Sequence, residues 1–204
     1  MEIYNLFPGS FGSNCYLLIS ENQAAVIDPS ANADVILQKV EQYGATLQYI
    51  LLTHGHFDHI CSLDTLRDKA GIPAYIHIGD LDMPSDADKN AFYTFFGSSR
   101  TYRTPEKTIQ EGDVLALGNE QISVLHTPGH TEGSVCYLCN DQFLITGDTL
   151  FERGFGRYDL YSGDPFKLRR SLKHLASLDP SLVIYPGHGA PTDLGDAIQN
   201  CTFI

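Results

Sequence analysis

The amino-acid sequence predicts an α+β fold of four layers, with two layers of strands at the centre and helices on both outer sides. Short apolar runs typical of buried strands occur in both halves of the chain. In each half these runs are joined by helical patterns, so the two halves look like weak copies of one order, strands and then a helix. Because strands need covering layers, this order places the helices outside.

The length of 204 residues, with 43% hydrophobic and 19% charged residues, is typical of a globular protein with a sizeable core. No linker or low-complexity tract interrupts the chain. We therefore predict one domain over residues 1–204.

In the first half, turn residues between Pro8 and Asn14 precede a series of strands. The strands are expected at Cys15–Ile19, Ala24–Ile27, Leu47–Leu52 and Ala74–Ile78. One helix is expected between Asn32 as its N-cap and Gly44 as its stop signal. Its apolar face is expected to comprise Val35, Ile36, Val40 and Tyr43. A second helix is expected over Ser62–Ala70.

The second half is rich in strands, followed by a helix and one more strand. The strands are expected at Val114–Leu117, Gln121–Leu125, Ser134–Leu138, Phe143–Ile145 and Leu182–Tyr185. The helix is expected over Pro165–Leu178, with Phe166, Leu168, Leu172 and Leu175 on its apolar face. Between the halves, residues 79–105 break the pattern with interleaved aspartates and the aromatic run Phe92–Phe96. This segment is either a wall or lid over a pocket or a cover for the core or an oligomer surface.

The formal net charge of −12 argues against nucleic acid or an anionic membrane as a partner. No secretory signal is visible, and the five scattered cysteines fit reduced thiols, so a cytoplasmic location is expected. Cys136 and Cys139 fall in one strand. Alternation points them to opposite faces, which makes them buried small residues rather than metal ligands.

The densest polar cluster is the stretch Thr53-His54-Gly55-His56-Phe57-Asp58-His59-Ile60, directly after an apolar strand. Three imidazoles and a carboxylate within six residues are ligands that suit zinc, iron or manganese. A strand end followed by a loop could direct all four at one point. The cluster therefore predicts a metal site rather than a solvated loop.

Three further loops repeat the order of strand, small residues and ligand. They contain His126-Thr127-Pro128-Gly129-His130-Thr131, Gly147-Asp148-Thr149 and Pro186-Gly187-His188-Gly189. A glycine beside each polar residue lets the backbone turn sharply and approach closely. His77, His126 and His174 are expected to be structural or exposed, and Thr53, Thr131 and Thr149 are candidates for orienting the ligands.

The motifs T-H-G-H-F-D-H, H-T-P-G-H-T, G-D-T-L-F and P-G-H-G, in this order, resemble those of the metallo-β-lactamase-fold superfamily. The resemblance is closest to its glyoxalase II-like (hydroxyacylglutathione hydrolase-like) branch, in the short single-domain form. It implies an αββα sandwich with two metal ions at one edge of the sheets. It assigns His54, His56 and His130 to the first ion and Asp58, His59 and His188 to the second, with Asp148 bridging both.

The resemblance also implies a dinuclear hydrolase, with zinc as the expected metal and iron or manganese as alternatives. Asp58, with a metal-bridging hydroxide, would be the catalytic group, and the hydroxide would attack an acyl-thiol carbonyl in a small-molecule thioester. Arg157 matches the position of a basic residue that holds a substrate carboxylate in this branch. The alternative for Arg157 is a surface ion pair with Asp159 or Asp164.

Two other functions share most of these motifs. One is a mononuclear iron oxidoreductase that resembles persulfide dioxygenases and uses the first site alone. The other is a diiron oxygen-reducing unit, which the intact set from His54 to His59 disfavours. Cys61 is expected to be a packed residue at a helix start, with a redox role as the alternative.

Overall fold

The computed structural model of the protein describes residues 1–6 and 11–204, so the predicted turn at Pro8–Ser10 lies outside the described residues. In this part of the chain the strands form two six-stranded sheets. The first sheet contains, in spatial order, β1 (Glu2–Asn5), β2 (Tyr16–Ser20), β3 (Gln23–Ile27), β4 (Thr46–Leu51), β5 (Ala74–His77) and β6 (Lys107–Ile109). The second contains β12 (Thr192–Asp193), β11 (Val183–Pro186), β10 (Phe143–Gly147), β9 (Val135–Cys139), β8 (Glu120–His126) and β7 (Val114–Leu117).

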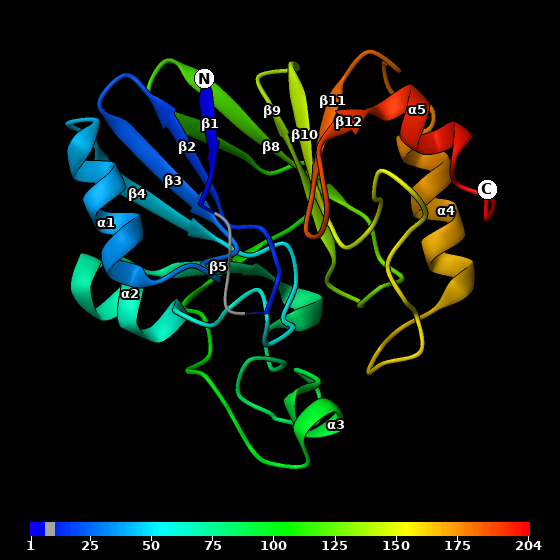
Figure 1. Ribbon diagram of the computed structural model, residues 1–204, viewed down its shortest axis with the longest axis horizontal. Coiled ribbons are helices and arrows are strands. Elements are labelled where there is room, and N and C mark those ends of the chain that lie inside the picture. The colour runs from blue at the N-terminus through cyan, green and yellow to red at the C-terminus, as the bar shows by residue number, and fades with distance from the viewer. Residues whose placement is uncertain (7–10) are drawn as a thin grey trace.

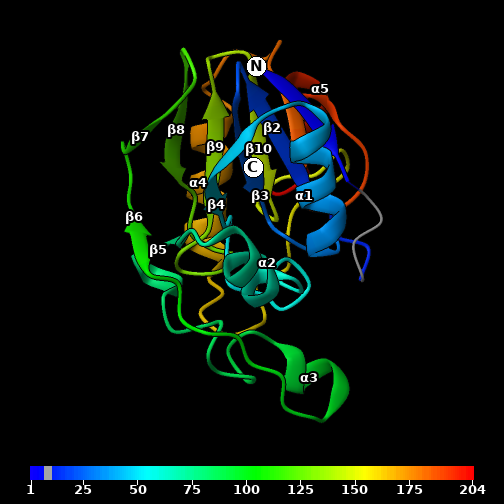
Figure 2. The same ribbon diagram turned by 90° about the vertical axis from the view of Figure 1, so that its left-hand side faces the viewer.

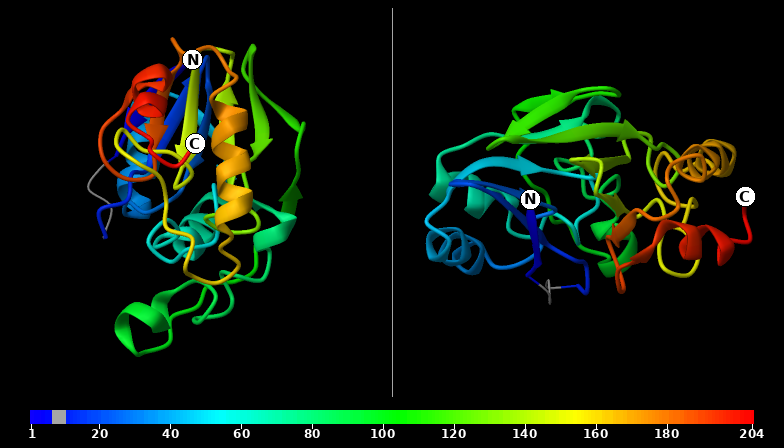
Figure 3. Two further views of the ribbon diagram at one scale, coloured as in Figure 1. Left: turned by 90° about the vertical axis from the view of Figure 1, so that its right-hand side faces the viewer. Right: turned by 90° about the horizontal axis from the view of Figure 1, so that it is seen from above.

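The helices lie on the two outer sides of the paired sheets, which confirms the predicted four-layer αββα sandwich (Figure 1). The first sheet is covered by α1 (Ala33–Gln42) and α2 (Leu63–Ala70), and the second by α4 (Pro165–Leu175) and α5 (Leu194–Gln199). The view from above in Figure 3 shows the same order of layers. None of the described helices is long and apolar enough to cross a membrane.

Three clusters of buried side chains fill the spaces between these layers, and alternation along the strands distributes residues among them. Leu17 packs under α1 and α2, whereas the next residue, Leu18, lies between the two sheets. Cys136 and Cys139 likewise belong to different clusters, as their spacing predicts. Central strands buried on both faces explain why their sequences read as continuous apolar runs.

The apolar faces of two helices differ from the prediction. In α1, Asn32 caps the N-terminus by accepting a hydrogen bond from the Asp34 backbone, as expected, but Val35 is 49% exposed. The buried face runs through Ile36 and Val40, and one residue corresponds to about 100° of rotation, which turns Val35 toward solvent.

In α4, Phe166 is 80% exposed, because it precedes Leu168 by two residues and therefore lies on the opposite side of the helix. The helix ends at Leu175 rather than at Leu178, and the following residues form turns. The short elements β6, β12, α3 (Phe92–Phe96) and α5 were not predicted.

The carboxyl ends of four strands meet at one edge of the sandwich. Parallel pairing of β3 with β4, and of β10 with β11, brings the ends of neighbouring strands together within each sheet. Across the sheets, the Val135 backbone N–H donates to the Thr53 carbonyl at 2.9 Å, and the Tyr137 hydroxyl donates to the Leu52 carbonyl at 2.7 Å. The loops after β4, β8, β10 and β11 therefore start from a fixed frame, and these are the loops that carry the predicted ligands.

Residues 79–105 lie beyond this edge of the sandwich. They contain the one-turn 3₁₀ helix η1 (Ile78–Asp80) at their start and α3, which lies apart from the sheets (Figure 2). Long-range backbone contacts hold the segment in place. The Phe57 N–H donates to the Asn90 carbonyl at 3.0 Å, and the Asn90 side chain donates to the Arg100 carbonyl at 3.0 Å.

Candidate metal centre

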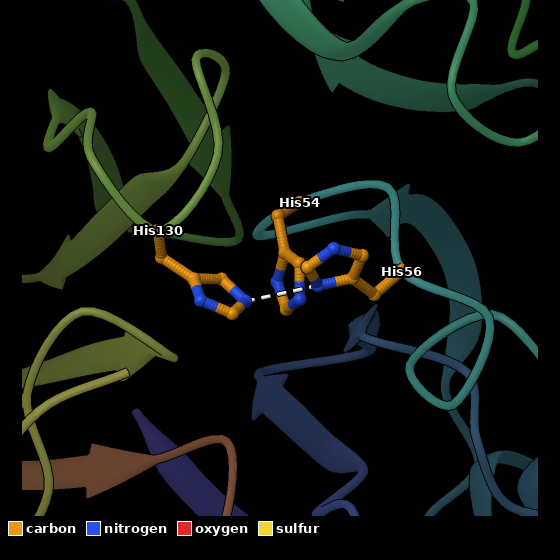
Figure 4. Close-up of side chains that lie close together, drawn as sticks. All are labelled: His54, His56 and His130. Carbon is orange, nitrogen blue, oxygen red and sulfur yellow. Dashed lines mark hydrogen bonds between the residues drawn. The ribbon is translucent and has the colours of Figure 1, made fainter. Parts of the chain in front are cut away.

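The structure brings the seven predicted ligand residues together, in two groups. The ligand atoms of His54, His56 and His130 all lie within 4.8 Å of one another, and their three rings converge from the loops after β4 and β8 (Figure 4). Asp58, His59 and His188 form a second group within the same limit. This is the division that the family resemblance implied.

Asp148 lies between the two groups. Its Oδ1 is 3.4 Å from His59 Nε2, while its Oδ2 is 3.6 Å from both His130 Nε2 and His188 Nε2. The carboxylate thus faces one histidine of the first group and two of the second. Asp148 is therefore placed where it could contribute to both ions.

Hydrogen bonds on the outer ring nitrogens orient the histidines toward this centre. The Thr53 hydroxyl donates to Asp28 at 2.6 Å, so its oxygen accepts the Nδ1 proton of His54 at 3.0 Å. Asp28 accepts the Nδ1 proton of His59 at 2.9 Å, and the Arg157 carbonyl accepts that of His130 at 2.6 Å. With Nδ1 carrying the proton, each Nε2 keeps a lone pair for a metal ion.

The inward atoms of the centre lack partners within the protein. Among the described residues, the buried side-chain atoms with no hydrogen-bond partner include His54 Nε2, His56 Nε2, His59 Nε2 and Asp148 Oδ1. Buried polar groups without partners are costly, about 1–3 kcal/mol each. His56 Nδ1 also lies only 2.9 Å from His130 Nε2. Divalent cations would give partners to one nitrogen of each of these histidines and to Asp148, so the residues fit the metal ions that the resemblance implies.

The protonation of the centre favours cations. Burial lowers the pKa of His54 well below its usual value and that of His56 to about 3, so both rings are neutral near pH 7. Burial would raise the pKa of Asp148, but the charge of His59 outweighs it and holds the pKa well below its usual range. Neutral imidazoles and ionised carboxylates are the forms that bind divalent metals.

Gly187 allows the close approach that this arrangement needs. A Cβ atom at this position would lie 2.2 Å from Asp148 Oδ1 and 2.7 Å from His59 Cε1. The neighbouring Gly147 has a φ of +48°, and a Cβ there would lie 2.6 Å from the Thr53 hydroxyl. Gly187 is therefore required by contacts with the centre itself, and Gly147 by its contact with Thr53.

Two buried carboxylates behind the centre were missed by the sequence analysis. Asp28 directly follows the predicted strand Ala24–Ile27, yet it is 2% exposed and bonds both Thr53 and His59. Its place at the end of β3, the strand that pairs with β4, was the available signal. Asp80 accepts bonds from Gly55 at 3.1 Å and Gly133 at 2.6 Å, joining the loops after β4 and β8.

The predicted orienting threonines behave differently from one another. Thr53 contacts His54 directly, whereas Thr131 donates to Asp80 at 2.7 Å and Thr149 pairs with Thr127 at 2.9 Å. The last two therefore stabilise the loops rather than touch a predicted ligand.

The remaining histidines and Cys61 stand outside the two groups. His126 Nε2 donates to the Glu132 carbonyl, 2.8 Å away, and the ring stacks on His77 with ring centroids 4.0 Å apart. His174 is exposed on α4. Burial raises the pKa of the Cys61 thiol to about 11, so the thiolate, which is the form reactive toward oxidants, is scarce near neutral pH.

A cavity of about 440 Å³ opens onto the centre. Its floor contains His56, Asp58, His130, Asp148 and His188, and its wall contains Phe11, Phe57, Ala91, Phe95, Phe96, Phe151, Gly156, Arg157 and Leu160. The predicted substrate-binding residue Arg157 therefore lines the cavity. Its guanidinium is paired with the Asp159 carboxylate, at 2.6 and 2.8 Å, which is the surface pair weighed as the alternative.

Comparison with known proteins places this site in a family. The profile described as the metallo-beta-lactamase superfamily matches residues 8–188. The probable metallo-hydrolase YqgX of Bacillus subtilis is 37% identical over 91% of this chain and 89% of that protein. The hydroxyacylglutathione hydrolase GloC of Haemophilus influenzae is 30% identical over 96% of this chain and 94% of that protein. The chain therefore belongs to the metallo-beta-lactamase superfamily, whose members are generally metal-dependent hydrolases.

Solved structures agree with this assignment. The BLEG-1 B3 metallo-beta-lactamase aligns with a TM-score of 0.89 and 32% identity over 97% of both chains. TTHA1623 in a di-iron-bound form aligns with a TM-score of 0.86 and 32% identity over 98% of this chain and all of that one. ETHE1 from Myxococcus xanthus aligns with a TM-score of 0.76 and 29% identity over 96% of this chain and 81% of that one. The family resemblance and the fold predicted from the motifs are thus confirmed.

Proposed function

We propose that the protein is a thioester hydrolase that uses two divalent metal ions. The observation that carries the proposal is the position of Asp148, whose two oxygens face both histidine groups. His54, His56 and His130 would hold one ion and Asp58, His59 and His188 the other, with Asp148 shared. The similarity to the hydroxyacylglutathione hydrolase GloC supports an acyl-thiol substrate.

When bound, the ions would supply Lewis-acid chemistry, lowering the pKa of water to about 7 and polarising a carbonyl. The protein's own residues position the reactants. Asp58 lines the cavity with its pKa held below the usual range, because burial is outweighed by the charge of His59. Its carboxylate lies 3.2 Å from His188 Nε2 and can accept a hydrogen bond from a water molecule on the cavity floor.

The proposed reaction consumes one water molecule for each thioester. The water oxygen bonds to the carbonyl carbon, the carbon–sulfur bond breaks, and its electron pair leaves on sulfur. One proton of the water ends on the thiol and the other in solvent, since the acid product is ionised near pH 7. Because a thiolate is a good leaving group, the site does not need a strong general acid.

Zinc is the metal we expect, because imidazole and carboxylate ligands in a compact site suit it. Iron is the main competitor, and the similar protein TTHA1623 has been crystallised in a di-iron-bound form. The functional test is therefore combined with metal analysis of one preparation.

A second candidate function is a one-iron oxidoreductase that acts on persulfides. The first group favours it, because His54, His56 and His130 are buried and close enough to hold an ion without the second group. In that case Asp58 would be dispensable for metal binding at the occupied site.

The experiment measures bound metal, hydrolysis of a thioester panel that includes S-lactoylglutathione, and oxygen consumption with glutathione persulfide. Two metal ions per chain with hydrolysis is the expected result. One iron per chain with oxygen consumption would refute the hydrolase. The Asp58→Ala variant is expected to lose the second ion and most hydrolysis. Unchanged turnover in this variant would contradict the two-metal arrangement.

A further inference from the structure

The wall of the cavity is formed mainly by phenylalanine side chains that contact one another. Phe57 stands at its base, 6% exposed, between the predicted ligands His56 and Asp58 in the chain. Its ring centroid lies 5.1 Å from that of Phe11, 5.9 Å from that of Phe95 and 5.6 Å from that of Phe96. We call these four residues, Phe11, Phe57, Phe95 and Phe96, the phenylalanine wall.

The upper part of the phenylalanine wall is exposed to the cavity and the solvent. Phe11 is 39% exposed, Phe95 52% and Phe96 50%. An apolar concave surface of this kind, beside a few polar groups, is typical of a ligand site. Since Phe57 borders the centre directly, an apolar group attached to a carbonyl at the centre would reach the wall.

The positive charge of Arg157 beside the cavity is already paired with a carboxylate. Of the described residues that line the cavity, Arg157 is the one lysine or arginine. Its guanidinium makes two hydrogen bonds to Asp159 and lies over the Phe95 ring, 5.6 Å from the centroid. Glutathione carries two carboxylates, and a cation that is already paired offers them little.

The thiol half of a biological thioester has amide or charged groups, so its apolar half is the acyl group. A second, shallower depression adjoins the centre at His188 and is lined by Phe151, Glu152, Arg153 and Gly189. Its charged residues suit the polar thiol half. The two hollows therefore assign the acyl group to the phenylalanine wall and the thiol half to the side of His188.

We propose that the phenylalanine wall selects thioesters with an apolar acyl group, of aryl or medium-chain size, over hydroxyacyl esters of glutathione. This proposal rests on the proposed hydrolase function and adds its substrate class. Each methylene that the wall buries is expected to raise kcat/KM by about fourfold. Four additional methylenes should therefore give a preference of at least tenfold, even if they are only partly buried.

The test compares S-acyl-N-acetylcysteamine esters that share one thiol and differ in the acyl group: acetyl, lactoyl, hexanoyl and phenylacetyl. S-lactoylglutathione is the fifth substrate. The metal-loaded wild-type protein is expected to prefer the hexanoyl and phenylacetyl esters over the acetyl and lactoyl esters at least tenfold in kcat/KM. A flat profile, or a preference for S-lactoylglutathione, would overturn the proposal while leaving the hydrolase function intact.

Two variants of α3 localise the effect. Phe96→Ala removes part of the wall, whereas Tyr93→Ala removes a side chain of the same helix that is 52% exposed but does not line the cavity. Phe96→Ala is expected to reduce the hexanoyl-to-acetyl ratio of kcat/KM at least threefold. Tyr93→Ala should keep the wild-type ratio. Equal ratios in all three proteins would refute a role for the wall.

A binding measurement separates this proposal from the hydrolase proposal. Calorimetry on the metal-free protein uses two thioethers that cannot be hydrolysed, S-(2-phenylethyl)- and S-methyl-N-acetylcysteamine. The phenylethyl probe is expected to bind at least tenfold more tightly, and Phe96→Ala should reduce this difference at least threefold. If no ester is hydrolysed but this preference holds, the hydrolase function fails and the apolar site stands. If both probes bind equally, the apolar site fails.

Discussion

Asp28 controls which nitrogen of His59 carries a proton, and the Asp28→Asn substitution tests this directly. In the structure, Asp28 Oδ1 accepts the Thr53 backbone N–H at 2.7 Å. Its Oδ2 accepts the Thr53 hydroxyl at 2.6 Å and His59 Nδ1 at 2.9 Å. Both oxygens are therefore engaged, and Asp28 keeps a proton on His59 Nδ1. Burial would lower the pKa of His59, but Asp58 and Asp148 outweigh it and raise the pKa well above its usual value, so a metal ion would displace the second proton, at Nε2.

In the Asp28→Asn variant the amide oxygen must stay on the Thr53 backbone N–H, so the amide nitrogen takes the place of Oδ2. It can donate to the Thr53 hydroxyl oxygen and to His59 Nδ1. His59 must then accept at Nδ1, which leaves its proton on Nε2, the atom that would bind the metal. The Thr53 hydroxyl proton loses its carboxylate acceptor in this arrangement, so the metal-free protein is expected to lose about 1–3 kcal/mol of stability.

A further cost appears in metal binding at the group of Asp58, His59 and His188. To bind an ion, His59 must return to its other tautomer, which breaks its new hydrogen bond to the introduced amide. In the variant, the charge-assisted hydrogen bond to the Asp28 carboxylate is no longer available to compensate. Such bonds contribute about 1.5–3 kcal/mol, which corresponds to a 10–100-fold loss of affinity. His54 can still donate to the Thr53 oxygen, so the first group should lose less than about threefold, roughly 0.6 kcal/mol.

Competition with a chelator, followed by metal analysis, measures both affinities. Asp141→Asn is the matched control. Asp141 is exposed and has a φ of 53°, close to the φ of 51° at Asp28, so it reports any effect of asparagine in this backbone conformation. Wild-type affinity at both groups in Asp28→Asn would refute the tautomer argument. An equal loss of metal affinity at both groups would refute the expected selective effect on the group of Asp58, His59 and His188.

Three further predictions concern the centre, the pH dependence and the cavity mouth. Gly187→Ala should lose metal shared through Asp148, since its Cβ would lie 2.2 Å from Oδ1; metal analysis checks this. Burial, aided by His126, lowers the pKa of His77 to about 4. Its stabilising contribution is therefore present above pH 6.5 and lost as the pH falls toward 4. Urea unfolding measures this. Between pH 7.5 and pH 4.5 the free energy of unfolding of His77→Phe should fall by on the order of 2 kcal/mol less than that of the wild type. Asp159→Asn should free the guanidinium of Arg157 and lower KM for S-lactoylglutathione about threefold. The KM for the lactoyl-N-acetylcysteamine ester should not change.

Each of these has an outcome that would contradict it. Gly195→Ala, whose Cβ would meet Pro180 at 3.2 Å far from the centre, is the control for Gly187→Ala, and equal metal contents would refute the clash. If His77→Phe and the wild type showed the same pH dependence of the free energy of unfolding, the pKa of His77 would not differ between the folded and unfolded states. An equal fall in KM for both lactoyl esters would show that Asp159 does not act through a carboxylate of glutathione.

The ligands could be predicted from the sequence because each directly follows a strand or a tight turn. A strand end fixes where the chain emerges, so His54, His130, Asp148 and His188 needed only the correct strand assignment. It was harder to predict which side of a helix faces the sheet. Val35 and Phe166 are apolar residues beside an apolar face rather than on it, and a sequence pattern does not show which apolar residue the sheet will cover.

The partners of the ligands could not be predicted, because they are distant in the chain. Asp28 lies 31 residues before His59, and Asp80 joins Gly55 to Gly133 across 25 and 53 residues. Only the pairing of strands brings them together. A buried carboxylate at the end of a strand looks the same in sequence as an ordinary turn residue, and three-dimensional neighbours decide its role.

The substrate site is harder to predict than the metal centre for a physical reason that Phe57 makes visible. This residue lies inside the predicted metal-binding stretch, yet its ring contacts the aromatic side chains of α3, with centroids 5.3 Å from Phe92 and 5.6 Å from Phe96. The position of α3 is set by contacts such as Phe57 N–H to the Asn90 carbonyl, rather than by packing on a sheet. Such a segment can change its sequence without disturbing the strand ends. The same metal centre can therefore face different walls, and the chemistry is encoded in the strands while the choice of substrate is encoded in the segment beyond them.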